Sequence, residues 1–164
     1  MKNNKESVEN ILKKINFKYF LEEDDGITVF KAGMRLDSEA KISRIKFDIF
    51  VTSRNILVIS GADIKADTKN IARMAEYICR ANYGLEDGNF EFDCDEGRIR
   101  YKSYIYNNGK ELDEESFLRS LVIASEMWKQ YGNGIVEIVG NSQSVPKDII
   151  QGIEEEIMEK SPEE

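Results

Sequence analysis

Side chains that commonly perform chemistry are sparse in this sequence, which contains no histidine. A chain without histidine cannot build a Ser–His–Asp triad or a histidine general base, and it lacks a component of most zinc and iron sites. Its two cysteines, Cys79 and Cys94, are too few for a disulfide framework or for a zinc site of their own. We predict that they lie on the apolar faces of a helix and a strand, where they stay reduced and unreactive.

Two glycine-containing segments come near to nucleotide-binding motifs without completing them. Gly132 and Gly134 begin the pattern of a dinucleotide-binding loop, yet Glu137 takes the place of its third glycine. Gly109-Lys110 would need a glycine at position 104 to form a phosphate loop, and Tyr104 stands there. The sequence therefore predicts no bound cofactor.

The acidic run Glu91-x-Asp93-x-Asp95 resembles the beginning of a calcium loop. However, Glu96 replaces the glycine of the sharp turn and Lys102 replaces the bidentate glutamate, so we predict no metal site. Asp93 and Asp95 could also work as paired carboxylates in acid–base catalysis. A cationic residue opposite Asp93 in a β-hairpin explains the same residues better.

Alternation of apolar and charged residues on both sides of Glu96-Gly97 predicts this hairpin. A two-residue turn at these positions matches apolar residues on one face and opposite charges on the other, and a slip by one residue breaks both matches. The expected pairs are Cys94–Ile99, Phe92–Tyr101 and Phe90–Ser103 on the inner face, and Asp93–Arg100 and Glu91–Lys102 on the outer face.

Hydrophobic periodicity in the first half of the chain predicts a helix at residues 5–21, ended by Asp24-Asp25-Gly26, and then three strands. The first two strands, near residues 30–36 and 45–51, alternate between apolar and polar residues, as strands with one buried face do. The third strand, Ile56–Ile59, is apolar on both faces, which is typical of a strand in the middle of a sheet.

Two helices are predicted on either side of the hairpin. The first begins at Asp67 or Thr68, either of which can cap a helix, and it ends at Gly84. The second begins at Asp113 and carries an apolar stripe as far as Tyr131.

The end of the chain is harder to assign from its pattern. Gly132-Asn133-Gly134 is expected to interrupt the second helix, and residues 135–139 could form a strand or a further helical turn. Pro146 begins a short last helix, and the acidic residues 158–164 are expected to fray into solvent. The resulting order, α-β-β-β-α-β-β-α with a short C-terminal helix, predicts a single α+β domain over residues 1–164, with helices packed on an antiparallel sheet.

Composition argues against several classes of partner. The 164 residues carry 31 acidic and 23 basic side chains, and the formal net charge of −8 repels nucleic-acid backbones and anionic lipid surfaces. The N-terminal segment has no continuous apolar run like that of a signal peptide, and the longest apolar run falls far short of the ~20 residues of a membrane helix. We therefore expect a cytoplasmic protein with no nucleic-acid or membrane partner.

One surface remains a candidate binding site. If the predicted strands share a sheet, one face carries cationic and aromatic side chains that could bind an acidic peptide or stacked bases. Alternatively, the cations pair with Glu91, Asp93 and Asp48, and the tyrosines cover an ordinary sheet surface. The residues of this face are Lys31, Arg35, Arg44, Lys46, Phe50, Arg98, Arg100, Lys102, Tyr104 and Tyr106. Those that we expect to contact a partner are Phe50, Arg100, Lys102, Tyr104 and Tyr106.

Three parts of the sequence share their pattern with a known family, namely Gly88–Tyr101, Leu112–Leu118 followed by Trp128, and Gly140–Ile150. On this pattern, residues 5–157 resemble the YbjN family, bacterial proteins described as sensory transduction regulators. The resemblance implies a fold similar to that of type III secretion chaperones, and a non-enzymatic, often dimeric cytosolic protein that binds other polypeptides. It also favours a helix at residues 135–139, and it brings no catalytic residues.

Two functions of different kinds are therefore open. The first is a protein-binding module, chaperone-like or regulatory, whose client is a protein or peptide that could be acidic, and a homodimer is compatible with it. The second is a small histidine-free enzyme that uses carboxylate or lysine chemistry, and a nucleic-acid-binding sheet is a more remote third. Caps, turns and cross-strand pairs account for the polar residues without leaving a convergent set, so the sequence favours the binding module.

Overall fold

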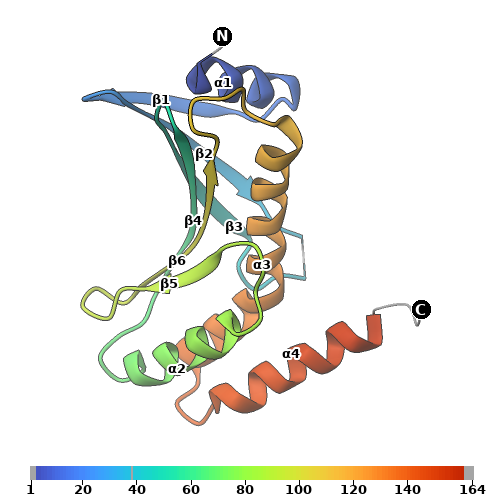
Figure 1. The fold of residues 1–164 in the computed structure, drawn as a ribbon. Coiled ribbons are helices and arrows are strands. Elements are labelled where there is room, and N and C mark those ends of the chain that lie inside the picture. Colours follow the sequence, from blue (N-terminus) through green and yellow to red (C-terminus); the bar gives the residue numbers. More distant parts are fainter. Residues whose placement is uncertain (1–2, 38, 161–164) are drawn as a thin grey trace.

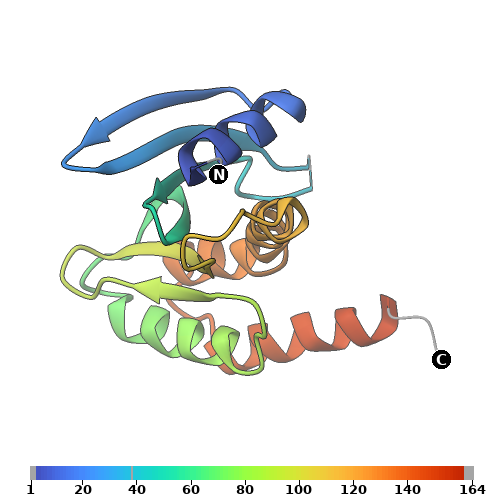
Figure 2. The ribbon, with the colours of Figure 1, turned by 45° about the horizontal axis from the view of Figure 1, so that its top comes forward.

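The computed structural model describes residues 3–37 and 39–160, and within these ranges it contains one six-stranded antiparallel sheet and four helices (Figures 1 and 2). Along the sheet the strands follow the order β1-β2-β3-β4-β6-β5. This confirms the predicted α+β class, with one strand more than predicted. The elements are α1 (Asn4–Lys14), β1 (Tyr19–Asp24), β2 (Ile27–Arg35), β3 (Arg44–Val51), β4 (Asn55–Lys65), α2 (Ile71–Asn82), β5 (Asn89–Phe92), β6 (Arg98–Tyr106), α3 (Glu114–Gly140) and α4 (Pro146–Lys160).

The additional strand, β1, lies where the sequence predicted the end of the first helix. The helix stops at Lys14, and Asn16 turns the chain with a positive φ of 55°. β1 then pairs with β2 along its whole length, and Asp25 and Gly26 join the two strands with φ angles of 42° and 80°. Two consecutive positive φ angles are typical of a tight hairpin turn, so Asp25-Gly26 connects two strands instead of ending a helix.

β4 and the start of α2 also differ from the prediction. β4 lies in the middle of the sheet as predicted, but it runs on to Lys65, and its pairing with β6 shifts between Gly61 and Lys65. The predicted helix caps Asp67 and Thr68 are wrong, because Asn70 occupies the N-cap position of α2. Asp67 closes the turn before the helix, since its side chain accepts a hydrogen bond from the Lys69 amide at 2.9 Å.

One face of the sheet, the inner face, is covered by α1 and α3 (Figure 1). Most of its residues on the central strands are buried, and Phe30, Phe47 and Tyr101 are among the largest of the fully buried side chains. Trp128 of α3 is also fully buried, and its indole Nε1 donates a hydrogen bond to Ser60 Oγ at 2.9 Å. These contacts fix the position of α3 on β4 and β6, so the hydrophobic core lies between the helices and this face.

Helix α3 passes through the two glycines that were predicted to interrupt it. A side chain at Gly134 would place its Cβ 2.3 Å from the Tyr77 hydroxyl, and one at Gly132 would lie 3.1 Å from Ile42. Tyr77 uses this space to donate a hydrogen bond to the carbonyl oxygen of Tyr131 at 2.7 Å. The glycines therefore permit close packing within a continuous helix, and residues 135–139 are helical, the alternative that the family resemblance favoured.

Helix α4 begins at Pro146, as predicted, but it is 15 residues long and therefore not short. Ile150 is buried, whereas the C-terminal half of the helix is exposed and projects away from the sheet (Figures 1 and 2). Of the tail predicted to fray, residues 158–160 form the last turn of α4, and residues 161–164 lie outside the described residues.

The β5–β6 hairpin exists, but its predicted register is wrong by two residues. Phe90 pairs with Tyr101 and Phe92 with Ile99, and a four-residue loop replaces the predicted two-residue turn. A shift of two residues keeps the side chains that remain paired on their predicted faces. Cys94 lies in this loop and is exposed, and Cys79 is exposed on α2, so the prediction that both cysteines lie on apolar faces is also wrong.

Candidate functional site

The second face of the sheet, here called the outer face, is not covered by any helix in the described part of the chain (Figures 1 and 2). The ten residues that the sequence placed on one surface all belong to this face, because strand pairing puts them on the side opposite the buried positions. Its apolar and aromatic residues are Phe20, Ile27, Val29, Phe50, Leu57, Ile59, Tyr104 and Tyr106.

An apolar row crosses the middle of the outer face. Val29 of β2 pairs with Phe50 of β3, Phe50 pairs with Leu57 of β4, and Leu57 pairs with Tyr104 of β6. Directly opposed residues in a sheet lie about 4.5–5.5 Å apart, so the four side chains form a continuous strip. Phe50 and Leu57 are half-buried by their neighbours alone, and 56% of Tyr104 is exposed.

The sequence prediction identified only part of this row. It selected Phe50 and Tyr104, and the structure places both beside Leu57, which the prediction did not select. The sequence of β4 contained the information needed to select Leu57. A strand that is apolar on both faces must expose some apolar residues if helices cover only one face of the sheet. The predicted residue Tyr106 lies further along β6, is 62% exposed, and donates a hydrogen bond to Asn108 at 3.1 Å.

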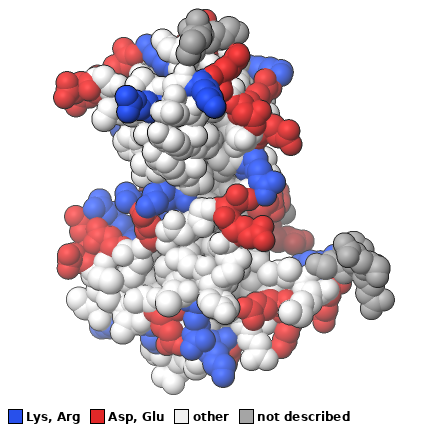
Figure 3. Space-filling model, in the orientation of Figure 1, with Lys and Arg blue, Asp and Glu red and all other residues white. Residues whose placement is uncertain are grey.

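The outer face is hollowed beside the apolar row. An open concavity of about 1280 Å³ lies between strands β3 to β6, with Phe50, Ile59 and Gly61 among its apolar lining. Charged side chains, including Lys46 and Arg100, also line it. Figure 3 shows the indentation on the left of the molecule, between the projecting β1–β2 and β5–β6 hairpins.

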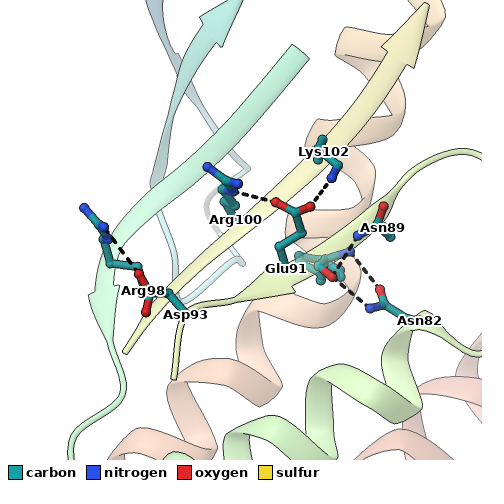
Figure 4. A network of polar contacts seen from close by, with 8 residues as sticks. Asn82, Asn89, Glu91, Asp93, Arg98, Arg100 and Lys102 are labelled. Carbon is teal, nitrogen blue, oxygen red and sulfur yellow. Dashed lines mark hydrogen bonds and ion pairs between the residues drawn. The ribbon is translucent and has the colours of Figure 1, made fainter. Parts of the chain in front are cut away.

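Glu91 of β5 is the centre of the charged part of the face (Figure 4). One of its carboxylate oxygens accepts a hydrogen bond from Arg100 Nε at 2.6 Å, and the other accepts one from Lys102. Partial burial disfavours the carboxylate, but the hydrogen bonds from Lys102 and Arg100 outweigh it and hold the pKa of Glu91 below its ordinary value. Two of the predicted contact residues therefore share a single acidic neighbour.

Most other cations of the outer face also have an acidic neighbour. Lys46 Nζ lies 2.6 Å from Asp63 Oδ1, Lys31 Nζ lies 2.7 Å from Glu22 Oε2, and Arg98 pairs with Asp93 at 3.3 Å. The described residues show no ion pair for three outer-face cations, Arg35, Arg44 and Lys65. The cross-strand pairing that the sequence offered as an alternative is therefore real for Glu91 and Asp93, and the face is less basic than its list of cations suggests.

The acidic loop of the hairpin is explained by turn structure. Asp93 Oδ1 accepts hydrogen bonds from the amides of Asp95 and Glu96, both at 3.0 Å. The Glu96 amide bond lowers the pKa of Asp93 against a desolvation cost, with help from the Asp95 amide and Arg98. Among the described residues no group of three or more cysteine, aspartate or glutamate side chains is placed to hold a metal ion. Asp93 therefore acts as a turn residue.

Within the described ranges, no helix has the length and apolar character that crossing a membrane requires.

No protein-family model and no curated protein sequence matches the chain. Among solved structures, the chain is similar to an uncharacterized protein from Methanothermobacter thermautotrophicus, with 14% identity and a TM-score of 0.52, over 83% of this chain and 99% of that one. It also aligns with a chain of the ExsC–ExsE complex, with 15% identity and a TM-score of 0.42, over 79% of this chain and 96% of that one. The first similarity shows a shared fold and no function, and membership of the YbjN family stays a prediction.

Proposed function

We propose that this chain is a protein-binding module that holds a segment of another polypeptide on its outer face. The observation that carries the proposal is the apolar row from Val29 to Tyr104. It crosses a sheet face that no helix of the described residues covers, and it lies beside an open hollow. Exposed apolar patches that are bordered by polar residues commonly mark contact sites. The role would be chaperone-like or regulatory, in the cytoplasm and without a catalytic centre.

The partner segment that suits this face combines apolar side chains with negative charge. Apolar side chains would pack on Phe50 and Leu57, and carboxylates would meet Arg35 and Arg44, for which the described residues supply no ion pair. Arg100 and Lys102 share one carboxylate, so they add further positive charge on the same face. Contacts of this kind steer association and weaken as salt concentration rises.

A nucleic-acid partner is less suited to the same face. Nucleic-acid binding depends on cations that neutralise phosphates, and here most outer-face cations already contact carboxylates in a chain of net charge −8. An apolar row that is half-buried before any partner arrives is better matched to a polypeptide.

The proposal can be tested by comparing two double variants in a pull-down from the cells that produce the protein. Phe50→Ser with Tyr104→Ser removes two members of the apolar row. Tyr83→Ser with Val122→Ser is the matched control, because these residues are 90% and 57% exposed on the helix-covered side. We expect the outer-face variant to retain at most about a tenth of the partner captured by the wild-type chain, and the control to retain all of it.

A folded outer-face variant that captures the same stoichiometric partner as the wild-type chain would contradict the proposal. Circular dichroism and thermal unfolding of both variants show whether they are folded. Raising the salt concentration should reduce capture by the wild-type chain, because part of the expected contact is electrostatic.

A further inference from the structure

The two edges of the sheet differ in how their backbones are protected. At the β5 edge, the side-chain amide of Asn82 accepts a hydrogen bond from the Phe90 amide at 2.7 Å and donates one to the Phe90 carbonyl at 2.8 Å (Figure 4). Asn82 thus takes the place that a neighbouring strand would fill. Within the described residues, no side chain makes a comparable hydrogen bond to the backbone of β1 on the edge that faces away from β2.

β1 has the properties of a strand that can accept a partner. Its six residues pair with β2 without a bulge, and it contains no proline. Phe20 is 81% exposed and Leu21 is 41% exposed. A regular edge strand with exposed apolar side chains presents unpaired amides and carbonyls to another strand.

Charges at an edge normally oppose such pairing, but here two of the three acidic residues of β1 already have a cationic neighbour within the chain. Glu22 contacts Lys31 at 2.7 Å, and Glu23 contacts Lys5 of α1. These ion pairs reduce the net negative charge that the edge presents to a second copy, although two carboxylates placed directly opposite each other would still repel.

From this geometry we propose that β1 pairs antiparallel with β1 of a second copy, about a two-fold axis at Leu21. A symmetric antiparallel pair places residues with an even sum of numbers opposite each other. At a sum of 42, Phe20 of one copy faces Glu22 of the other, and Lys18, the residue directly before β1, comes opposite Asp24 when the pairing extends by one residue. The Lys18–Asp24 pair forms twice, once at each end of the interface, so the strand is complementary to itself.

Neighbouring symmetric registers are less favourable. An axis at Glu22 would bring Glu22 against its own copy, which is destabilising for like charges directly opposed in a sheet. An axis at Phe20 would leave Asp24 beyond the paired strand and would use fewer residues of β1. The axis at Leu21 pairs all six residues of β1.

The two-fold axis would join the two sheets and place both outer faces on the same side of one continuous sheet. This interface depends on the edge of the sheet and not on the apolar row, so it is independent of the proposed partner-binding function. The contact is short, and we expect a concentration-dependent dimer.

Sedimentation or light scattering over a concentration series tests the proposal with charge variants. Lys18→Glu places two acidic residues opposite each other at both ends of the interface. We therefore expect the association constant of the dimer to fall at least tenfold. Lys18→Glu combined with Asp24→Lys restores opposite charges across the axis and should restore the dimer. Glu159→Lys, a charge change on the exposed part of α4, is the control and should leave the dimer intact.

Cysteine cross-linking determines the register. In a background of Cys79→Ser with Cys94→Ser, a Leu21→Cys substitution places two thiols opposite each other at the axis, whereas Phe20→Cys does not. Mild oxidation should cross-link Leu21→Cys faster than Phe20→Cys. A wild-type chain that stays monomeric throughout the series, a charge swap that fails to restore the dimer, or faster cross-linking at position 20 would each overturn the proposal. A monomeric chain that still captures its partner would leave the proposed function standing.

Discussion

Phe47 and Phe50 lie three residues apart on β3, and they meet opposite surroundings. Phe47 points to the inner face, where it is fully buried and its ring lies 5.9 Å from that of Phe17. Phe50 points to the outer face, where Val29 and Leu57 flank it and which no helix of the described residues covers. The same residue type therefore supports the fold on one side of the strand and remains available for contact on the other.

The difference teaches which apolar residues the fold requires. The helices shield the inner-face residues from water, so truncating one of these side chains leaves a cavity. Outer-face residues are shielded only by neighbouring side chains, including the ion-paired residues around Glu91. Substitutions on the outer face should accordingly affect binding more than folding.

The largest expected effect is on the pair that defines this comparison. Phe47→Ala should lower the free energy of unfolding by about 3–5 kcal/mol, because it leaves a cavity beneath α1 and α3. Phe50→Ala should lower it by about 1 kcal/mol or less, because the side chain is not enclosed. Denaturant unfolding of the two variants measures both values, and equal losses would mean that the outer face is part of the core.

A second test compares the tips of the two projecting hairpins. Gly97 has φ 70°, and a Cβ there would lie 1.9 Å from the Ala66 carbonyl oxygen, whereas Gly26 has φ 80° and open space around it. Gly97→Ala should therefore cost about 2–4 kcal/mol, from strain and from the backbone clash together.

Gly26→Ala is the matched control, because it introduces backbone strain from the positive φ without a clash. It should lower the free energy of unfolding by about 1–2 kcal/mol. Thermal unfolding measures both variants. A Gly97→Ala variant as stable as the control would show that the β6 end does not pack against the backbone after β4.

Alkaline pH should lower the free energy of unfolding by ionising a buried tyrosine of the inner face. Burial raises the pKa of Tyr101 from an ordinary value of 10 to about 12, with a smaller contribution from Asp87. Since the folded state favours the neutral phenol, this stabilisation is complete below pH 10 and is lost as the pH rises toward 12. Tyr101→Phe cannot ionise, so its unfolding free energy should fall less steeply with pH in this window.

At neutral pH the same variant should be about 1 kcal/mol less stable, because the carbonyl of Asp87 loses the Tyr101 hydroxyl as a donor. Denaturant unfolding at a series of pH values measures both effects. Identical pH dependence of the variant and the wild-type chain between pH 10 and 12 would contradict the burial of this hydroxyl.

The smallest expected effect is the loss of stability at acidic pH that comes from Glu91 on the outer face. The pKa of Glu91 is lowered, so its stabilisation is present above the ordinary value of 4.5 and is lost as the pH falls through the lower folded value. Glu91→Gln should cost less than about 1 kcal/mol at neutral pH and should remove that part of the acid dependence. The difference should shrink at high salt, and a variant with unchanged acid unfolding would argue against the pairing with Arg100 and Lys102.

Alternation along the strands was enough to predict the face of the residues that form strand pairs, but Cys94 lies in a loop, and the rest required contacts between distant segments. The hairpin register slipped by two residues without exchanging faces, because the loop length depends on the contact of Gly97 with Ala66. The first three residues of β1 were predicted as the end of a helix, because their strand conformation depends on pairing with β2.

The same reason explains the errors in the helices and in the site. The two glycines of α3 are explained only once Tyr77 and Ile42 lie against them. In the candidate site, Phe50 and Tyr104 were selected by residue type, and Leu57 was recognised only when pairing placed it between them.

The central claim is that another polypeptide contacts the outer face, and photocrosslinking in living cells tests it most directly. A photoreactive amino acid replaces Leu57, in the middle of the apolar row, or Val122, which is 57% exposed on α3. We predict that light produces a covalent adduct with a different polypeptide at position 57 and not at position 122. Equal adducts at the two positions, or an adduct at position 122 alone, would contradict the account.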